Sequence, residues 1–585
     1  MKHKDILMVL MLLSIPAIAA AQLFEVGGIS YQVLSPSEHT VEVIPRLSCT
    51  YYSGNINIPS TVSHNDTIYV VVALGEEAFC YARLSSITIP STVTQIKDGC
   101  FLFASVPSSI TIPASVTYIG PLAFAANNLT NITVDANNTS YMSMDGMLFS
   151  KDTTTVVECM LTKSGTVSLP QDTRHISSLA FAYCHNIVGI TLPEGLSSIG
   201  SWAFVDNQRL NHVVIPSSVT HLGACPFPNC PALSSLSIAE GNTHYYMDGM
   251  MIYSVGGDTL VSAHRSADSV YLPSTLRYVT GFGGNSTVRY VHIPDGVNTI
   301  GNEAFNGSSL VSIDLPARLA SIDDWAFYNC TSLARIAMPV SLDTMGEGVF
   351  HSCCQLTSIT IPNRLRTIPE AAFFMCTSLS RITWGDSVEV IDTSAFGDCA
   401  FPELVLPATL RSIRQTAFIG DYNGRLKRVI FSAPVDTIEM DAFYMQPLSL
   451  LRLKNLQPPV TTADGCLDNT FVDTISIPCG SLNAYLADPY WGQFSDVYRE
   501  DCSQIDSATN HMITVYPNPA TTRLTIGVNS GNCRVELVNA LGQSVLSQCV
   551  DGGTANIDVA GIARGIYFLI LRTTARPAMR KVVLQ

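Results

Sequence analysis

Charged residues are scarce in this chain of 585 residues: Lys, Arg, Asp and Glu together make up only 14% of it. The acidic residues outnumber the basic ones, 47 to 32, so the formal net charge is −15 at pH 7. No run of Lys and Arg stands out along the sequence. Binding to duplex nucleic acid or to an anionic membrane relies on clustered basic residues. The charge balance therefore argues against both classes of partner.

The sequence also lacks the short motifs of common enzymes and metal sites. It contains no H-E-x-x-H, no G-x-S-x-G, no P-loop, no C-x-x-C and no D-x-D-x-D-G loop. The twelve histidines are scattered, and Cys354 has no evident base beside it for nucleophilic chemistry. We therefore predict no enzymatic activity, no catalytic residue, no cofactor and no metal site.

Long apolar runs are missing beyond the N-terminus. After residue 22 there is no stretch of 18 or more apolar residues, so we expect no transmembrane helix. The first 21 residues differ, because Lys2 and Lys4 precede a short apolar stretch, and Ala19 and Ala21 lie just before Gln22. This order is typical of a secretory signal peptide that is cleaved before Gln22. The sequence therefore predicts an exported protein.

What the chain does contain is a repeat. The segment DWAFYNCTSLARIAMP, residues 324–339, is followed by GVFHSCCQLTSITIP, AAFFMCTSLSRITW and SAFGDCAFPELVLP. The cysteines in the repeat position, Cys330, Cys353, Cys376 and Cys399, are each 23 residues after the last. A fixed period of about 20 to 50 residues indicates a solenoid.

The repeat unit reads L-x-x-I-x-I-P-x-x-V-x-x-I-x-x-x-A-F-x-x-C-x-x, as in LSSITIPSTVTQIKDGCF from Leu84. The alternation before the proline predicts a strand with one buried face, and the proline ends that strand. A second apolar pair follows, such as Val93 and Ile96, and then a turn that directs a phenylalanine inward. The phenylalanines in this position are Phe124, Phe181, Phe204, Phe305, Phe327, Phe350, Phe373, Phe396, Phe418 and Phe443. Because only stacked units can bury a continuous core, we predict a β-rich (α+β), curved, right-handed solenoid with a parallel sheet on one side.

Seventeen cysteines in an exported protein would usually suggest a disulfide framework. Six of them, however, share one repeat position, which Ala or Asn fills in other units. They are Cys184, Cys230, Cys330, Cys353, Cys376 and Cys399, and the alternatives are Ala82, Ala104, Asn127 and Asn207. We interpret this as a small buried turn position, where a free cysteine packs as a small hydrophobe and points the same way as its neighbours, which is poor geometry for a bridge. Elsewhere disulfides are plausible, with open pairing, among Cys466, Cys479, Cys502, Cys533 and Cys549.

The register of this unit resembles the BspA-type leucine-rich repeat of bacterial surface proteins. The resemblance covers about residues 75–455 and is interrupted by two inserts that resemble each other. Each insert reads as a hairpin, with turns near Lys151-Asp152 and Gly256-Gly257. The resemblance implies a leucine-rich-repeat solenoid exposed on a cell surface.

The two ends of such an array need caps, because their cores would otherwise be exposed. The C-terminal cap is expected to contain a short helix, with Tyr485, Trp491 and Phe494 covering the last layer. The predicted organisation is a signal peptide (1–21), an N-terminal β cap (22–74), repeats (75–455) with inserts at 132–160 and 236–264, a C-terminal cap (456–502), a linker (503–512) and a C-terminal domain (513–585).

The C-terminal domain has a different pattern from the repeats. Short alternating segments separated by Gly, Pro and Asn turns predict a small antiparallel β-sandwich. Its motifs resemble the type A sorting domain of the type IX secretion system. The matching residues are Pro517, Asn518, Pro519, Ala520, Gly542, Gly565, Tyr567 and Lys581. The resemblance implies transport across an outer membrane by the type IX machinery to the cell surface, and whether the domain is then removed stays open.

In each predicted strand, the residue between the two inward apolar positions and the residue two positions before it should face out from the sheet. Down the array these positions form a broad, hydroxyl-rich surface with few aromatic residues. The candidate ligand face consists of Thr88, Thr111, Thr133, Thr191, His292, Asp314, Arg335, Thr360, Arg381 and Thr383. Threonine also favours strands for its own sake, so this pattern has a purely structural interpretation as well.

The resemblance and this surface together predict an exported, cell-surface-anchored repeat protein that mediates adhesion or binds an extracellular protein or glycan. The alternative is a structural or spacer protein of the outer surface without a specific ligand. A separate pattern also keeps two interpretations: Asp followed by Thr, as at Asp152-Thr153 and Asp258-Thr259, resembles an O-glycosylation signal of exported Bacteroidetes proteins. The same residues suit the turn before a strand.

Overall fold

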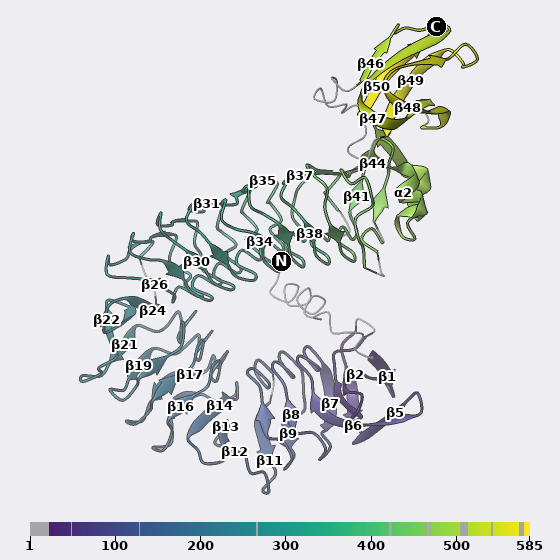
Figure 1. Ribbon diagram of the computed structural model, residues 1–585. Helices are drawn as coiled ribbons and strands as arrows, with labels where there is room; N and C mark the ends of the chain where they lie inside the picture. The colour runs from purple at the N-terminus through teal and green to yellow at the C-terminus, as the bar shows by residue number, and fades with distance from the viewer. Residues whose placement is uncertain are drawn as a thin grey trace. The chain divides into compact units, whose positions relative to one another are not determined.

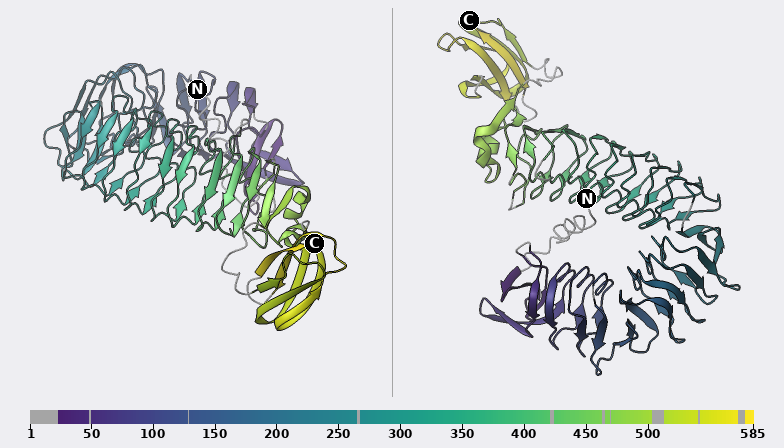
Figure 2. Two further views of the ribbon diagram at one scale, coloured as in Figure 1. Left: turned by 90° about the horizontal axis from the view of Figure 1, so that it is seen from above. Right: turned by 180° about the vertical axis from the view of Figure 1, so that it is seen from behind.

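The computed structural model describes residues 23–47, 50–127, 129–264, 267–420, 424–462, 465–468, 470–502, 513–539, 542–572 and 578–585. The predicted signal peptide, with Ala19 and Ala21, lies outside these residues. The chain divides into two compact units, one of Met1–Ser387 with Asp392–Ala400 and one of Val388–Ile391 with Phe401–Gln585. Both consist mainly of short strands joined by turns, as Figures 1 and 2 show.

The first unit begins with a mainly antiparallel sheet that leads into the repeats. Its strands are β1 (Leu23–Val26), β2 (Ile29–Ser35), β3 (Thr40–Val43), β4 (Ser53–Asn57), β5 (Thr61–His64) and β6 (Thr67–Leu74). β1, β2 and β3 pair antiparallel in that order, β5 forms a hairpin with β6, and β3 pairs in parallel with β6. β6 and β4 in turn provide parallel partners for the first repeat strands.

The repeats of the first unit contribute to two kinds of parallel ladder, each broken into separate sheets. The long ladder, formed before the proline, contains β7 (Arg83–Thr88), β9 (Ser109–Ile112), β11 (Asn131–Val134), β15 (Gly165–Ser168), β17 (Ile187–Thr191), β19 (His212–Ile215), β21 (Ser235–Ile238), β25 (Ser269–Tyr271), β27 (Tyr290–His292), β29 (Ser312–Asp314), β31 (Arg335–Ile336), β33 (Ser358–Thr360) and β35 (Arg381–Thr383). The short ladder contains β8 (Gln95–Ile96), β10 (Tyr118–Ile119), β16 (His175–Ile176), β18 (Ser198–Ile199), β20 (His221–Leu222), β26 (Tyr278–Val279), β28 (Thr299–Ile300), β30 (Ser321–Ile322), β32 (Thr344–Met345) and β34 (Thr367–Ile368).

The predicted parallel sheet is present as the long ladder, and the structure adds the short ladder, which the sequence pattern did not predict. The second apolar pair of the repeat also forms an extended segment, because residues such as Ile96 turn inward while residues such as Gln95 face out. Two residues per repeat are enough for a ladder when every neighbouring repeat presents the same two.

The two inserts each form three strands. The first contains β12 (Tyr141–Met144), β13 (Met147–Ser150) and β14 (Thr155–Cys159), and the second contains β22 (Tyr245–Asp248), β23 (Met251–Ser254) and β24 (Thr259–Ala263). Neighbouring strands within each insert pair antiparallel, and the predicted turns at Lys151-Asp152 and Gly256-Gly257 lie between the second and third strands. The third strand then pairs in parallel with the short ladder, as β14 with β16 and β24 with β26. Each insert therefore enters the stack of repeats rather than hanging outside it.

The second unit continues the same design and ends in a cap. Its ladders are β36 (Val390–Ile391), β38 (Ser412–Ile413) and β40 (Thr437–Ile438); β37 (Glu403–Leu406), β39 (Arg428–Phe431), β42 (Leu450–Arg452), β44 (Ile475–Pro478) and β45 (Tyr498–Asp501); and β41 (Pro447–Leu448) with β43 (Phe471–Val472). The short helix α2 (Leu482–Ala487) and the 3-10 helix η1 (Trp491–Val497) follow β44. Tyr485 and Trp491 are fully buried, and Phe494 is half-buried against Trp491 and Tyr490. Among the described residues, no helix is both long and apolar enough to cross a membrane.

Stacked phenylalanines run through the core of each unit. Successive rings in a stack lie nearly parallel with centroids 4.9 to 5.5 Å apart, for example Phe181 on Phe204 and Phe305 on Phe327. The predicted phenylalanines all belong to such stacks. The structure adds four that the repeat pattern did not identify, Phe79, Phe101, Phe227 and Phe282.

The turns that carry these phenylalanines hydrogen-bond to one another in a single direction. In the turn around Phe79, the N–H groups of Glu77, Phe79 and Tyr81 all donate to carbonyls of the next turn, at 2.8 to 3.1 Å. The same set recurs in the turns of Phe101, Phe181, Phe204, Phe305, Phe327, Phe350, Phe373 and Phe418. In most of these turns the residues two positions before and after the phenylalanine have positive φ, for example +52° at Glu77 and +56° at Tyr81, which turns alternate N–H groups the same way. The peptide dipoles of this turn stack are therefore aligned, with N–H groups directed toward the C-terminal neighbour.

The cysteine position lies in the same turns, three residues after the phenylalanine. All six predicted cysteines are buried and free, and most donate their S–H to the carbonyl of the preceding turn's phenylalanine, such as Cys330 to Phe305 at 3.0 Å and Cys376 to Phe350 at 3.0 Å. Asn207 donates to the Phe181 carbonyl at 2.8 Å in the same way. The position therefore accepts a small side chain, and in the repeats with Cys or Asn that side chain also donates a hydrogen bond, whereas Ala82 and Ala104 fill the position without a donor.

The C-terminal domain is an antiparallel sheet of five strands, as predicted. They are β46 (Ile513–Tyr516), β47 (Arg523–Asn539), β48 (Ser544–Asp558), β49 (Gly565–Arg572) and β50 (Ala578–Leu584). The first part of β47 pairs with β46 and its last part with β49, so this long strand changes partners along its length. An apolar core that includes Leu524, Leu537 and Leu569 lies within the domain.

Candidate ligand-binding face

All ten residues of the predicted face are exposed, and all lie in long-ladder strands of the first unit. Each is flanked by an inward-facing residue, such as Ile110 before Thr111 and Ile359 before Thr360, so the strand alternation places them outward as expected. The sequence alone was therefore sufficient to find the outward positions of this ladder.

The register brings some of these residues side by side. Thr133 lies opposite Thr111, Thr383 opposite Thr360, and Asp314 opposite His292. Thr88, Thr191, Arg335 and Arg381 have no other member of the set opposite them in the pairings that the structure describes. The ten residues therefore line a long surface rather than converge on one pocket.

One part of this surface differs from the rest, because it carries aromatic side chains. Tyr271 on β25 is 81% exposed and Tyr290 on β27 is 46% exposed. His292, also on β27, lies opposite Tyr271 with ring centroids 5.7 Å apart. Neither tyrosine is among the ten predicted residues of the face. The segment SVYLP matches the strand and proline of the unit, so its tyrosine could have been found by the same alignment.

Polar and charged groups surround these rings. The His292 Nδ1 atom lies 3.7 Å from a carboxylate oxygen of Asp314, and Arg289 Nε lies 3.4 Å from Asp268 Oδ1. All four side chains are more than half exposed. We call Tyr271, Tyr290, His292 and Asp314 the aromatic patch. Such a patch offers flat apolar rings beside hydrogen-bonding groups, which is a combination that suits a sugar ring or a peptide side chain.

The buried cysteines offer no reactive centre. Burial raises the pKa of the Cys330 thiol to about 12 and that of the Cys230 thiol to about 12, so both are held as neutral thiols. In the cap, Cys479 and Cys502 form a disulfide between consecutive turns of the stack. We expected poor geometry for a disulfide between cysteines in neighbouring repeats. That expectation does not apply at the end of the long ladder, where the Cα atoms of Cys479 and Cys502 are 4.8 Å apart. Cys466 is buried and free, Cys549 is exposed and free, and the side chain of Cys533 lies outside the described residues.

Among the described residues, one group has the composition of a metal site: Cys479, Glu500 and Cys502. Its two sulfurs are already joined to each other. Glu500 Oε1 accepts hydrogen bonds from the N–H groups of Gly480 and Leu482 at 2.8 and 3.1 Å. This cluster therefore fastens the end of the cap rather than offering free ligands.

The Asp-Thr segments of the inserts form compact turns. Asp152 Oδ1 accepts hydrogen bonds from the Thr154 N–H and hydroxyl, which lowers the pKa of Asp152 together with a bond from Ser150. Asp258 Oδ1 accepts hydrogen bonds from Ser254 and Thr259 in the corresponding turn. These contacts give the two aspartates a structural role before β14 and β24.

In the C-terminal domain, the predicted sorting motif holds the end of the chain. The Asn518 side chain donates to the Lys581 carbonyl and accepts from the Val583 N–H, both at 2.8 Å. Ala520 exchanges backbone hydrogen bonds with Val583 and Gln585. Tyr567 is buried and its hydroxyl donates to the Ala563 carbonyl, whereas Lys581 is exposed and Gly542 turns with φ +77°. The motif residues are far apart in sequence but lock the last strand in place; Leu541 lies outside the described residues.

Comparison with known protein families decides the identity of the repeats. A family model described as "BspA type Leucine rich repeat region (6 copies)" matches residues 53–156, 157–253, 263–379 and 346–463. The chain belongs to this leucine-rich repeat family. Residues 514–585 match a model described as "Secretion system C-terminal sorting domain". This repeat protein is therefore secreted through the type IX system to the cell surface.

Several solved structures are similar to this chain. A leucine rich cell surface protein from Faecalibacterium prausnitzii is 25% identical, with 62% of this chain and 94% of that chain covered and a TM-score of 0.35. The pneumococcal vaccine antigen PcpA is 20% identical, with 67% and 93% covered and a TM-score of 0.33. A leucine-rich repeat protein from Bacteroides ovatus is 20% identical, with 82% and 99% covered and a TM-score of 0.34. None of the curated proteins matches the chain.

Proposed function

We propose that this leucine-rich repeat protein is an adhesin, and that the exposed face of its long ladder binds an extracellular protein or glycan. The observation that supports the proposal most is the aromatic patch. Tyr271 lies on β25, the edge strand of its sheet, and is 81% exposed, so it gains little from burial and packing does not account for it. Tyrosine is enriched at the energetic centres of binding surfaces, where its ring supplies contact area at a small entropic cost.

The remainder of the face fits the same role as a shallow platform. Thr111, Thr133, Thr360 and Thr383 present hydroxyl groups in pairs along the strands. Surfaces of this kind bind weakly at one point, but many copies at a cell surface add their contacts through avidity. We also propose that no chemistry is catalysed here, because the face lacks a convergent pocket with an activated nucleophile or base.

A spacer protein of the outer surface is the second candidate. It is favoured by the uniform threonine content of the face, since threonine stabilises strands without any ligand. The two proposals differ in what the aromatic patch should do. A spacer tolerates its removal, whereas an adhesin loses affinity.

The experiment screens the mature chain, from residue 22, for binding to extracellular-matrix proteins, to host glycans and to whole bacteria. A saturable partner is then tested against Tyr271→Ser and His292→Ala. The matched control is Tyr118→Ser, because Tyr118 is also an exposed strand tyrosine, at 45%, but lies in the short ladder. Selective loss of binding in the patch variants supports the adhesin. Equal binding by all variants would show that the aromatic patch does not bind the partner. If a well-folded chain binds no partner at all, the result favours the spacer.

A further inference from the structure

The aligned turn stack is broken at the two inserts, and the two breaks are filled differently. Each insert places its third strand between two turns, after the turn of Phe124 in the first case and after the turn of Phe227 in the second. The strand pairing of the two inserts can be superimposed residue by residue. Glu158 of β14 then corresponds to Ser262 of β24, and Cys159 corresponds to Ala263. The N–H groups of Cys159 and Ala263 also donate equivalently, to Ala180 and Gly281, at 2.7 Å in both breaks.

At the first break, a carboxyl group receives the N–H of the interrupted turn. The Phe124 N–H is directed toward both oxygens of Glu158, each 3.1 Å away. Glu158 is 3% exposed and comes from the insert itself. A carboxyl group suits this position because the aligned N–H groups of the turn stack end there with their positive ends exposed.

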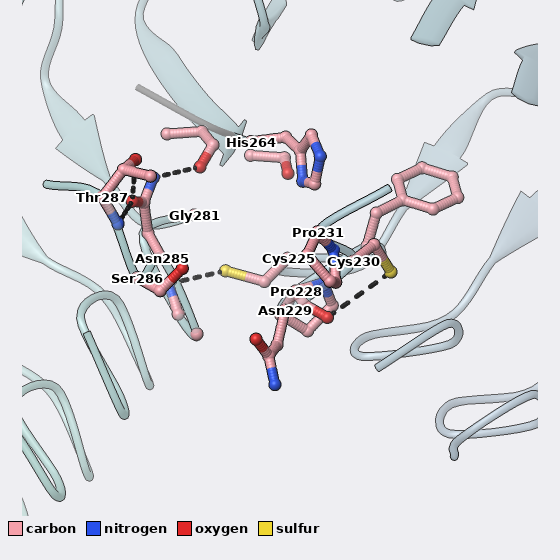
Figure 3. Close-up of a pocket in the computed structure, with 15 residues that line it drawn as sticks. Cys225, Pro228, Asn229, Cys230, Pro231, His264, Gly281, Asn285, Ser286 and Thr287 are labelled. Carbon is pink, nitrogen blue, oxygen red and sulfur yellow. Dashed lines mark hydrogen bonds between the residues drawn. The ribbon is translucent and has the colours of Figure 1, made fainter. Parts of the chain in front are cut away.

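At the second break, the equivalent side chain is too short to reach. Ser262 ends at its hydroxyl, and the N–H groups of Phe227 and Asn229 have no hydrogen-bond acceptor among the residues that the structure describes. A pocket lies here instead, with about 370 Å³ of empty space, part of it open to solvent. Figure 3 shows it between the segment of Cys225 to Pro231 and the segment of Gly281 to Thr287, with His264 at its edge.

We propose that this pocket binds a small carboxylate of the size of acetate, which takes the place that the Glu158 carboxyl group takes in the first break. Replacing the hydroxyl of a serine by CH2–COO⁻ gives glutamate, so the group that Ser262 lacks is an acetate unit. The hydrogen-bond donors for such an ion are already in place as backbone N–H groups, which bind anions without a basic side chain.

The lining of the pocket is compatible with this ligand. No Asp or Glu is among the lining residues that the structure describes, and the nearby Asp206 carboxylate is hydrogen-bonded by the Asn229 side chain. The Cys225 thiol stays neutral, because burial raises its pKa to about 12, and its sulfur is already an acceptor for the Gly283 N–H at 3.1 Å. His264 Nε2 is held by the Leu233 carbonyl at 3.1 Å. The pocket is also more open than the site of Glu158, so a bound ion is less desolvated than that side chain.

The test measures the melting temperature of the mature chain against acetate concentration at constant ionic strength and pH, with chloride as the balancing anion. A ligand that binds only the folded state raises the melting temperature in a saturable way. We expect that rise for the wild type and expect Ser262→Glu to be insensitive to acetate, because its own carboxyl group fills the pocket. Ser269→Glu, at an exposed position on β25, adds the same charge elsewhere and should keep the response.

A second variant covers the case in which Ser262→Glu does not fold. Glu158→Ser copies the second break at the first one, so it should be destabilised and then rescued by acetate more strongly than by chloride. A crystal grown with acetate should show the ion within hydrogen-bonding distance of the Phe227 and Asn229 nitrogens. An absence of any saturable response in wild type and Glu158→Ser, or a pocket that holds only water at high acetate concentration, would overturn the proposal.

Discussion

Every repeat of the first unit has two regions that differ sharply, the turn stack and the exposed long-ladder face. In the turn stack, the phenylalanine, the donor three residues later and the one-way N–H bonds recur with nearly constant geometry. On the face, equivalent positions carry Thr133, Tyr271, His292 and Asp314. The difference shows where stacking constrains the sequence: each turn is fixed by two neighbours, whereas an outward side chain contacts mainly solvent. Sequence variation that serves recognition can therefore collect on the face without disturbing the stack.

The largest effect that separates the two regions is expected from a stacked phenylalanine. Phe305→Ala removes a fully buried ring that stacks on Phe282 and Phe327. We expect a loss of roughly 3–5 kcal/mol in the free energy of unfolding, from lost burial and from the cavity that remains. Urea denaturation followed by circular dichroism measures it. A loss below about 1 kcal/mol would mean that the stack tolerates a missing ring, which contradicts the comparison.

A pH effect is expected at the one place where the stack ends on a carboxyl group. Burial raises the pKa of Glu158 from 4.5 to about 8, and the Phe124 N–H opposes this shift. A group with a raised folded pKa binds its proton more tightly when folded, so its stabilising contribution is complete below pH 4.5 and is lost as pH rises to about 8. Each unit of pKa difference corresponds to roughly 1.4 kcal/mol.

Glu158→Gln tests this effect, because glutamine keeps an acceptor for the Phe124 N–H but cannot ionise. We expect the wild type to lose stability relative to this variant between pH 5 and pH 8, measured by urea denaturation across that range. Parallel pH profiles for the two proteins would show that the carboxyl group titrates normally and is not enclosed in the folded state.

A smaller effect is expected at the donor position. Cys353 donates to the Phe327 carbonyl at 3.2 Å, so Cys353→Ala leaves a buried acceptor without its partner. We expect a loss of about 1–2 kcal/mol, and a smaller loss for Cys353→Ser, which keeps a donor. Equal losses would mean that size alone matters at this position. In the folded wild type, alkylation of Cys330 should be slow, since its raised pKa leaves little thiolate.

The two regions also differ in how far the sequence predicts them. The inward phenylalanines and the outward threonines follow from strand alternation and the repeat period, which are local properties. The one-way turn stack does not, because it depends on positive φ values at residues such as Trp325 and Ala371, whose own preferences do not signal them. The phenylalanines missed at positions 227 and 282 lie beside the inserts, where CPFPNC and GFGGN depart from the A-F spacing.

Sites formed by contacts between distant segments were also beyond the sequence. The disulfide between Cys479 and Cys502 depends on the pairing of β44 with β45, which the sequence does not reveal. The roles of Glu158 and Ser262 depend on where each insert enters the stack, which the sequence pattern of the inserts does not reveal. By contrast, the sorting motif was found from sequence, because its residues recur in a fixed order even though their contacts, such as Asn518 with Val583, span the whole domain.

The smallest effect on stability is expected on the exposed face, and it completes the comparison. Tyr271→Ser removes a ring that is 81% exposed and contacts mainly His292. We expect the free energy of unfolding to change by no more than about 0.5 kcal/mol, as is usual for surface substitutions. Urea denaturation of the variant beside Phe305→Ala measures both regions in one experiment. A loss of about 2 kcal/mol or more for Tyr271→Ser would mean that the ring contributes to the packing of the sheet. The exposure of Tyr271 would then no longer support ligand binding by the aromatic patch.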